Sequence, residues 1–255
     1  TKPDYPIRAM NTYLYKRLGF HYDRDDMYAL QLKNRYLNGV LDTKAGSCTT
    51  LPLLYLALAQ RLGYSVYPVA APQHLFCRYR LPDGTHQNIE ATAGGWSPDE
   101  DYIRDMEIPE HGLKSGAYME NMTYRQLLGD LLIENGGLWA RQGNFLRAVR
   151  YYTIGLQLNP KAAEAYRMLG AAYRQLAKEY HRMASDLPTI INQPALELTR
   201  QIYFNNSRQY AEQAEQAFER TEALGAAPPT QTNYWVRQNE LRATAQTVSQ
   251  KGGVP

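Results

Sequence analysis

The sequence predicts an α+β fold in which a cysteine-bearing helix packs on a small antiparallel sheet and α-helical repeats follow. Apolar residues recur at helical spacing after Cys48, and alternating segments follow between residues 65 and 91. A 34-residue period runs through the second half. We expect a cysteine-bearing domain over residues 1–121, a helical module over 122–248 and a mobile tail over 249–255.

The composition excludes two broad classes of function. With 255 residues, 44% of them hydrophobic, the chain can bury a sizeable core. The net charge of +3 comes from scattered basic residues, so we do not expect a nucleic-acid partner. The longest apolar run, residues 51–59, is much shorter than the roughly 18 residues that span a membrane.

The first residue is Thr1, with no initiator methionine, which is compatible with removal of a leader. We therefore favour an exported or periplasmic location over a cytoplasmic one. We also expect the protein to be a monomer.

Two helices are expected before Cys48. Residues 7–18 carry apolar side chains at intervals of three or four, and Gly19 follows as a stop signal. The acidic segment 23–26 suits a turn or a helix N-terminus, where carboxylates favour the helix dipole. A second helix is predicted over residues 27–41. Its apolar positions are Leu30, Tyr36, Leu37 and Val40.

The central helix begins close to Cys48 and ends at Gly63. Its apolar residues at helical spacing are Leu51, Leu54, Tyr55, Leu58 and Leu62. Residues 53–58 are apolar on nearly all sides, which predicts a buried helix that fixes Cys48 in place. A thiol at the N-terminus of such a helix faces the positive end of the dipole, which stabilises the thiolate. Cys48 is therefore the candidate nucleophile.

Alternating segments then predict three strands, over residues 65–71, 74–80 and 85–91. Along the second strand, His74, Phe76 and Arg78 share one face, whereas Cys77 lies on the other. Cys77 is therefore expected to be a buried structural thiol. A disulfide would consume the nucleophile, so we expect both cysteines to be free.

The loop between the last two strands suits three residues. Pro82 and Asp83 fit a type I turn, and Gly84 fits the left-handed position of a bulge. This loop sets Leu81 opposite Thr85, so that the numbers of paired residues sum to 166.

The pairing decides whether His74 gains an acidic partner. In this register Glu90 and Asn88 lie on the face of His74, with Glu90 diagonally next to it. A two-residue loop would instead place Glu90 on the face of Cys77. We expect Glu90 to accept the ring N–H of His74, with Asn88 as the alternative, because either oxygen can orient a catalytic histidine. The competing interpretation is that Glu90 is an ordinary solvated carboxylate.

A cysteine, a histidine and an orienting group form the constellation of a cysteine hydrolase or acyl transferase. The histidines show no zinc-ligand spacing with each other or with cysteine, so no metal and no cofactor are expected. They are His21, His74, His86, His111 and His181.

Four blocks of the sequence resemble the transglutaminase-like superfamily. They are KAGSCTTLPLLY at residues 44–55, RLGY at 61–64, APQH at 71–74 and NIEATAGG at 88–95. The most similar branch is that of the bacterial SirB1-type domains, and the resemblance covers about residues 8–96. It implies a papain-like core, in a family whose members act as transglutaminases, peptidases or amidases.

The resemblance assigns Cys48 as the nucleophile, His74 as the base, and Glu90 to the position where many relatives have Asp. Glu90 departs from the family pattern, because its side chain is one methylene longer than that of Asp. Some SirB1-type relatives lack the cysteine, so the fold can be kept without the chemistry. This chain has the cysteine, at position 48.

The oxyanion hole is expected to use the backbone N–H of Cys48 and one further donor. Asn34, Asn38 and Gln73 are candidates for that donor. The sequence does not choose between them, and each is also compatible with an ordinary surface amide.

Residues 96–121 show little periodicity, and we interpret them as a connector in preference to a wall over a substrate groove. Beyond them, three positions recur 34 residues later, which is the tetratricopeptide period: Leu132, Gly136 and Trp139 return as Tyr166, Gly170 and Tyr173. After residue 177 the second repeat no longer follows the tetratricopeptide pattern, which indicates an elongated helix or an insertion. A last helix over residues 234–241 is expected as a cap.

In tetratricopeptide-like helices, Arg141, Arg167 and Arg174 would line the concave groove and suit an acidic peptide or a C-terminal carboxylate. A solvated basic face is the simpler alternative. Together, the sequence predicts a cysteine-dependent amide or peptide hydrolase or acyl transferase that forms a thioester, with helices that bind a protein or peptide. The alternative is a non-catalytic interaction scaffold in which Cys48 is a relic.

Overall fold

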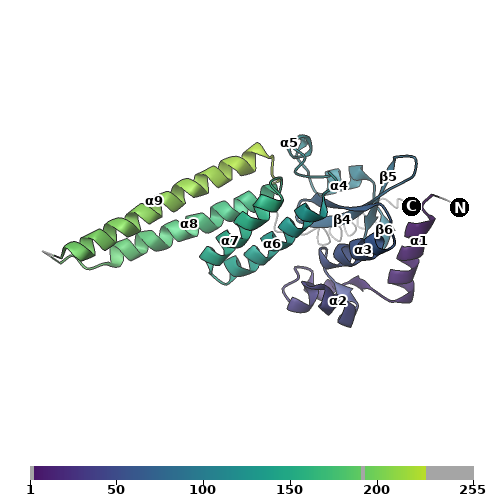
Figure 1. Cartoon of the computed structure of the whole chain (residues 1–255), viewed down its shortest axis with the longest axis horizontal. Helices are drawn as coiled ribbons and strands as arrows, with labels where there is room; N and C mark the ends of the chain where they lie inside the picture. The colour runs from purple at the N-terminus through teal and green to yellow at the C-terminus, as the bar shows by residue number, and fades with distance from the viewer. Residues whose placement is uncertain (1–2, 191–192, 228–255) are drawn as a thin grey trace, which may run out of the picture. The chain divides into compact units, whose positions relative to one another are not determined.

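The computed structural model describes residues 3–190 and 193–227. These residues form an α+β protein with two compact units (Figure 1). The described part of the first unit comprises residues 3–109, 118–123 and 227, and that of the second comprises 110–117, 124–190 and 193–226. The expected cap helix over 234–241 and the tail over 249–255 lie outside the described residues.

The first unit opens with a continuous helical run. Helix α1 (Tyr5–Asn11) passes directly into a π-helix, η1 (Thr12–Arg17). Ile7, Met10 and Leu14 are buried along it. The helix predicted over residues 7–18 is confirmed, although its second half has the wider π-helical turn.

The helix predicted over residues 27–41 is wrong. After β1 (His21–Tyr22) the chain forms two 3-10 turns, η2 (Arg24–Asp26) and η3 (Leu32–Asn34), and only then the short helix α2 (Leu37–Thr43). The Asp26 carboxylate accepts the backbone N–H groups of Leu30 and Gln31, which a continuous helix would direct to its own carbonyls. Ala29 has a positive φ of 48°, which also breaks the helix.

The chain then reaches the cysteine through β2 (Ala45–Gly46), which pairs in parallel with β1. Helix α3 (Thr50–Arg61) follows and buries Leu51, Tyr55 and Leu56. The predicted central helix is therefore confirmed.

A four-stranded antiparallel sheet follows, in the order β3-β4-β5-β6. Its strands are β3 (Val66–Ala71), β4 (His74–Arg80), β5 (His86–Glu90) and β6 (Gly95–Trp96). Arg78 pairs with Asn88 and Cys77 with Ile89, so the paired numbers sum to 166 as predicted. The three-residue loop is also confirmed, because the N–H of Leu81 donates to the carbonyl of Thr85 and Gly84 has a φ of 87°.

The outer edge of β3 is occupied by residues 118–123. The N–H of Met119 donates to the Ala70 carbonyl at 2.9 Å, and the N–H of Met122 donates to the Pro68 carbonyl at 2.8 Å. Asn121 forms a β-bridge with Val69. The segment 96–121, interpreted above as a connector, also contains α4 (Asp99–Asp105) and α5 (Glu110–Lys114).

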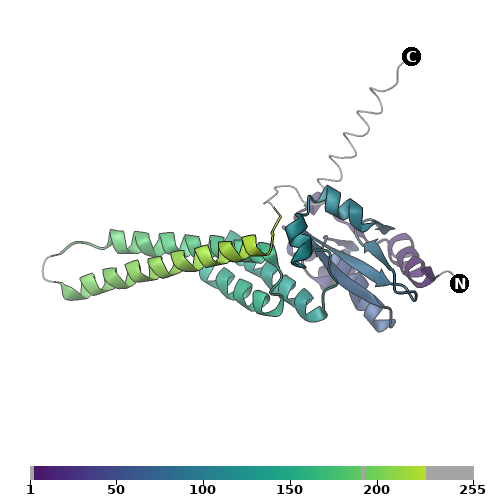
Figure 2. The same ribbon diagram turned by 90° about the horizontal axis from the view of Figure 1, so that it is seen from above.

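The second unit contains paired antiparallel helices (Figure 2). They are α6 (Tyr124–Arg141), α7 (Phe145–Leu158), α8 (Ala163–Asp186) and α9 (Pro194–Ala223). Its core includes Ile133, Tyr152, Leu169 and Ala217. A Cβ atom on Gly136 would lie 2.7 Å from the Tyr152 ring, and one on Gly170 would lie 2.8 Å from the Phe218 ring. In each helix pair, a glycine thus gives room to an aromatic ring of the partner helix.

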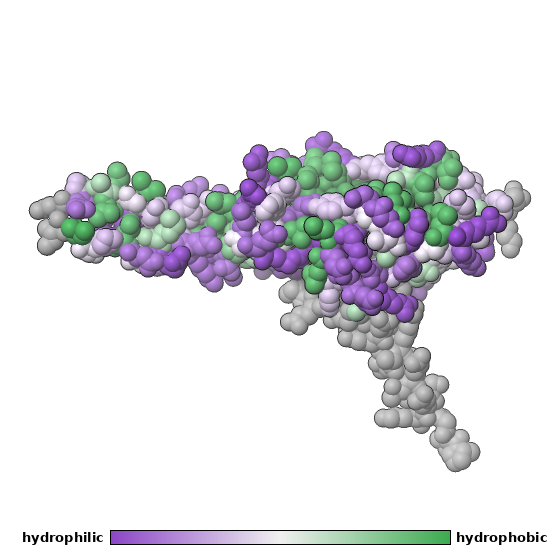
Figure 3. Space-filling view, turned by 90° about the horizontal axis from the view of Figure 1, so that it is seen from below, coloured by the Kyte–Doolittle hydropathy of each residue, from purple (hydrophilic) through white to green (hydrophobic). Residues whose placement is uncertain are grey.

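The departure expected after residue 177 is an elongation of both helices of the second pair, because α8 has 24 residues and α9 has 30. Figure 3 shows that hydrophilic residues predominate on the visible face of this pair, with apolar patches between them. Among the described residues, no helix combines the length and apolarity needed to cross a membrane.

Candidate active site

The candidate nucleophile lies in a short loop between β2 and α3. Cys48 is a free, half-exposed thiol two residues before the first helical residue, Thr50. The Ser47 hydroxyl accepts the backbone N–H groups of Thr49 and Thr50, both at 3.2 Å, and so ties the loop to the start of the helix. Within the described part of the chain, the backbone N–H of Cys48 donates no hydrogen bond.

His74, the first residue of β4, is buried and faces two of the predicted partners. Its Nε2 lies 2.8 Å from Oε2 of Glu90. Its side chain also interacts with the Cys48 side chain. Because Glu90 occupies Nε2, a proton exchanged with Cys48 would pass through the other ring nitrogen, Nδ1.

The electrostatics of the buried pair favour a charged imidazolium beside a carboxylate. Burial lowers the pKa of His74, but the Glu90 charge and the hydrogen bonds with Cys48 and Glu90 outweigh burial and raise it to about 10. Burial likewise raises the pKa of Glu90, whereas the His74 charge and its hydrogen-bond donors bring it below the usual value. The pair therefore holds its charges at neutral pH.

Glu90 has further donors that the sequence analysis missed. The backbone N–H of Thr92 donates to Oε1 at 3.2 Å, and the Thr92 hydroxyl donates to the same oxygen. The hydroxyl of Tyr102, on α4, donates to Oε2 at 2.8 Å. These contacts immobilise a carboxylate that is one methylene longer than aspartate.

The ring of Tyr102 is fully buried and stacks on Phe76, with centroids 4.1 Å apart. Its centroid lies 6.1 Å from that of His74. Helix α4 thus packs against the buried pair, so the part of the segment 96–121 that forms α4 is more than the connector interpreted above. The acidic residues after Pro98, which begin α4 at Asp99, were the sequence signal for this helix.

Asn88, the alternative orienting residue, is engaged elsewhere. Its Oδ1 accepts from Nε of Arg78, and its Nδ2 donates to Ser97 and Asp99. Arg78 also donates to Oδ1 of Asp99 at 2.6 Å and to the Met119 carbonyl at 2.6 Å. This network fixes the start of α4, and through α4 it holds Tyr102 against Glu90.

The candidates for the second oxyanion donor fall in different places. Asn34 is fully buried, and its Nδ2 donates to Asp23 at 2.9 Å and to Asp26 at 2.7 Å, so its amide is not available as that donor. Asn38 is exposed on α2. Gln73 is exposed in the turn before His74, with a positive φ of 54°.

The other expectations concern the second thiol, metals and the arginines. Cys77 is fully buried, and its Sγ lies 3.7 Å from the Pro52 carbonyl oxygen, so the expected buried thiol is confirmed. In the described ranges, no cluster of three His, Cys, Asp or Glu residues suits a metal ion.

Arg141 ends α6, and Arg167 and Arg174 lie on α8. Arg174 pairs with Glu215 of its own unit at 3.1 Å.

Comparisons with known proteins identify relatives of the chain. UPF0162 proteins of Xylella fastidiosa strains Temecula1 and 9a5c are each 28% identical over 173 residues, which cover 66% of this chain and 60% of the relative. The chain therefore spans about 60% of the length of these relatives. Human F-box only protein 21 is 38% identical over 73 residues, 29% of this chain and 11% of its own length.

No solved structure matches the chain significantly. The family model of the transglutaminase-like superfamily matches residues 1–132, which is more than half of the 255 residues. With its cysteine loop, its strand histidine and its small antiparallel sheet, the chain belongs to the transglutaminase-like superfamily.

Proposed function

We propose that this protein is a cysteine-dependent amide or peptide hydrolase or acyl transferase that acts through Cys48, His74 and Glu90. The observation that carries the proposal is the buried His74, whose Nε2 is held by Glu90 at 2.8 Å while its side chain interacts with Cys48. A histidine oriented by a carboxylate and joined to an accessible thiol is the machinery of nucleophilic acyl chemistry.

In the proposed reaction, His74 holds as imidazolium the proton that the Cys48 thiol gives up, and the thiolate attacks an amide carbonyl carbon. The backbone N–H of Cys48 donates a hydrogen bond to the oxyanion of the tetrahedral intermediate. His74 then returns the proton to the leaving amine, the C–N bond breaks and a thioester remains. Water yields an acid, or an amine yields a new amide, and each reaction regenerates the thiol.

We assign the binding of a protein or peptide to the helical unit. The matching contacts of Gly136 with Tyr152 and of Gly170 with Phe218 support two tetratricopeptide-like repeats. We assign Arg141, Arg167 and Arg174 as its cationic groups for an acidic peptide. Changing Arg167 to Glu should weaken binding to acidic C-terminal peptides about tenfold, whereas Arg182→Glu on the exposed side of α8 should not. Equal affinities for both variants would contradict this assignment.

The catalytic proposal is tested with the two cysteines of the chain. Iodoacetamide labelling, read by mass spectrometry, should modify Cys48 rapidly in the native protein and leave the buried Cys77 unmodified. The Cys77→Ala variant should label at the native rate, and Cys48→Ala should not label. Replacing His74 with Gln should slow labelling of Cys48 by at least about a hundredfold at neutral pH, because a general base contributes that much or more.

A library of peptides and amides then tests turnover. Native protein and Cys77→Ala should release product, and Cys48→Ala should release none. An inert Cys48 in the folded native protein, or equal turnover by Cys48→Ala, would exclude the enzyme and leave the interaction scaffold as the function.

A further inference from the structure

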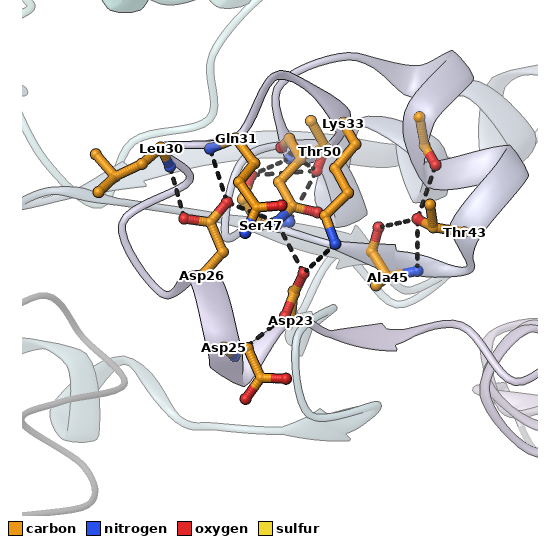
Figure 4. A network of polar contacts seen from close by, with 12 residues as sticks. Asp23, Asp25, Asp26, Leu30, Gln31, Lys33, Thr43, Ala45, Ser47 and Thr50 are labelled. Carbon is orange, nitrogen blue, oxygen red and sulfur yellow. Dashed lines mark hydrogen bonds and ion pairs between the residues drawn. The ribbon is translucent and has the colours of Figure 1, made fainter.

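The loop that presents Cys48 is held by buried hydroxyl groups on both sides of it (Figure 4). Thr50 Oγ1 accepts the backbone N–H of Ser47 at 2.9 Å and donates to the Asn34 carbonyl at 3.1 Å. The Ser47 hydroxyl lies 3.1 Å from Thr50 Oγ1. Because Thr50 gives its only proton to Asn34, the Ser47 hydroxyl is the donor in this pair.

The two hydroxyls therefore use their full hydrogen-bonding capacity. Each donates once, and each accepts twice when the backbone N–H groups bound by Ser47 are included. Ser47 is 3% exposed and Thr50 is 2% exposed, so no solvent competes for these bonds. A buried network that satisfies every member fixes one arrangement of its loop.

A second set of bonds anchors this pair to the preceding chain. The side chain of Asn34 donates to the carboxylates of Asp23 and Asp26. The backbone N–H of Asp23 donates to the Gly46 carbonyl at 2.9 Å. The chain is thus tied at Gly46, before the cysteine, and at Thr50, after it.

Close packing reinforces the anchor. A Cβ atom on Gly46 would lie 3.0 Å from both Thr50 Oγ1 and a Leu51 side-chain carbon. The backbone before Cys48 therefore runs directly against the Thr50 hydroxyl, and a larger residue at Gly46 would displace it.

We propose that Thr50 is a positioning residue, whose hydroxyl locks the Ser47–Thr49 loop so that the thiol and the backbone N–H of Cys48 are presented together. This inference rests on the proposed function for its effect on acyl chemistry, but the lock itself is a property of the folded chain. Ser47 contributes by occupying the N–H groups of Thr49 and Thr50, and the N–H of Cys48 stays available to an oxyanion.

Thr50→Val removes the hydroxyl at nearly constant volume, and Thr50→Ser restores it. The matched control is Thr221→Val, because Thr221 is also buried in a helix and donates only to the Ala217 carbonyl. Two reactions of Cys48 are compared in the full chain. Acylation by p-nitrophenyl acetate forms a sulfur–carbon bond through an oxyanion and expels p-nitrophenolate, whereas alkylation by iodoacetamide displaces iodide without an oxyanion.

The ratio of the acylation rate to the alkylation rate should fall about tenfold in Thr50→Val, because a displaced oxyanion donor affects only acylation. Thr50→Ser and Thr221→Val should keep the native ratio. A folded Thr50→Val with the native ratio would overturn the effect on chemistry.

A second measurement does not depend on activity. Amide hydrogen exchange of Ser47 should accelerate about tenfold or more in Thr50→Val and stay native in Thr50→Ser, because its acceptor is lost only in the first variant. The Leu62 amide, which donates to the Leu58 carbonyl at the other end of α3, is the internal reference. If Cys48 proves inert but Ser47 exchange responds, the proposed function fails and the lock stands. Native Ser47 amide exchange in a folded Thr50→Val variant would contradict the proposal that Thr50 holds the loop.

Should Thr50→Val fail to fold, Ser47→Ala provides the same test from the other hydroxyl. It removes the acceptor of the Thr49 and Thr50 amides, so their exchange should accelerate and the ratio of the two Cys48 rates should fall. Native exchange at both amides in this variant would overturn the proposal.

Discussion

His74 Nε2 lies 2.8 Å from Glu90 Oε2, although sixteen residues separate them, because an odd-length loop joins their two strands. In this register, where Arg78 pairs with Asn88, the side chains of His74 and Glu90 lie on the same face of the sheet. The number of residues in a surface turn thereby determines whether the Glu90 carboxylate faces the buried His74.

Deleting Gly84 should separate this pair, because a two-residue loop moves Glu90 to the face of Cys77. We expect alkylation of Cys48 to slow by at least about tenfold. Gly84→Ala keeps the loop length and should cost about 1 kcal/mol of stability at a φ of 87°, while alkylation stays fast. Native alkylation kinetics in a folded deletion variant would contradict the register argument.

Replacing Tyr102 with Phe removes a donor to the Glu90 carboxylate and keeps the ring stacked on Phe76. The pKa of Glu90 lies below its usual value, so its contribution to stability is present above the unfolded-state pKa and is lost as the pH falls. Without the Tyr102 donor this pKa rises, and the acid limb of Cys48 reactivity should move up by about one pH unit.

The control for that variant is Tyr55→Phe, which removes an equally buried hydroxyl that donates to Asn11 at 2.8 Å. Both variants should unfold at lower denaturant concentration than the native protein. Only Tyr102→Phe should shift the pH profile, and a common shift would show that Tyr102 has no particular role at Glu90.

Adjacent glycines of α6 should respond in opposite ways to alanine. A Cβ atom on Gly136 would meet the Tyr152 ring at 2.7 Å, so Gly136→Ala should destabilise the helical unit by about 1–3 kcal/mol. The nearest atom to a Cβ on Gly137 is 3.9 Å away, so Gly137→Ala should be neutral or stabilise by up to about 1 kcal/mol. Chemical denaturation of the two variants tests the repeat packing directly.

The helical unit should lose stability as the pH rises from about 4 to 7. Burial raises the pKa of Asp130 to about 7; the charges of Glu134 and Glu164 add to this effect, and a hydrogen bond from Asn159 opposes it. The folded state therefore binds more protons than the unfolded state across this range, and ionisation costs stability. Asp130→Asn should flatten the profile and add roughly 1–2 kcal/mol at pH 7.5.

The matched control is Asp186→Asn at the exposed end of α8, which pairs with Arg182 at 3.3 Å. Thermal unfolding between pH 4 and 8 should show the native slope in this control. A native slope in Asp130→Asn would contradict the assignment to Asp130.

The sequence was sufficient where a local rule determines the structure. Strand alternation and the Gly84 turn located His74 beside Glu90, and the apolar period after Cys48 located α3. It was insufficient where a side chain competes with the backbone: the Asp26 carboxylate takes the N–H groups that the helix predicted over residues 27–41 needed. Tyr102 was missed because its contact with Glu90 depends on the tertiary packing of α4.

The covered edge of β3 bears on how a substrate can be held. Residues 118–123 already take up backbone groups along β3, and Pro68 in that strand has no N–H to offer. At the opposite edge of the sheet, β6 is only two residues long. A polypeptide therefore has little strand to extend by β-augmentation, and the sheet offers a poor template for aggregation.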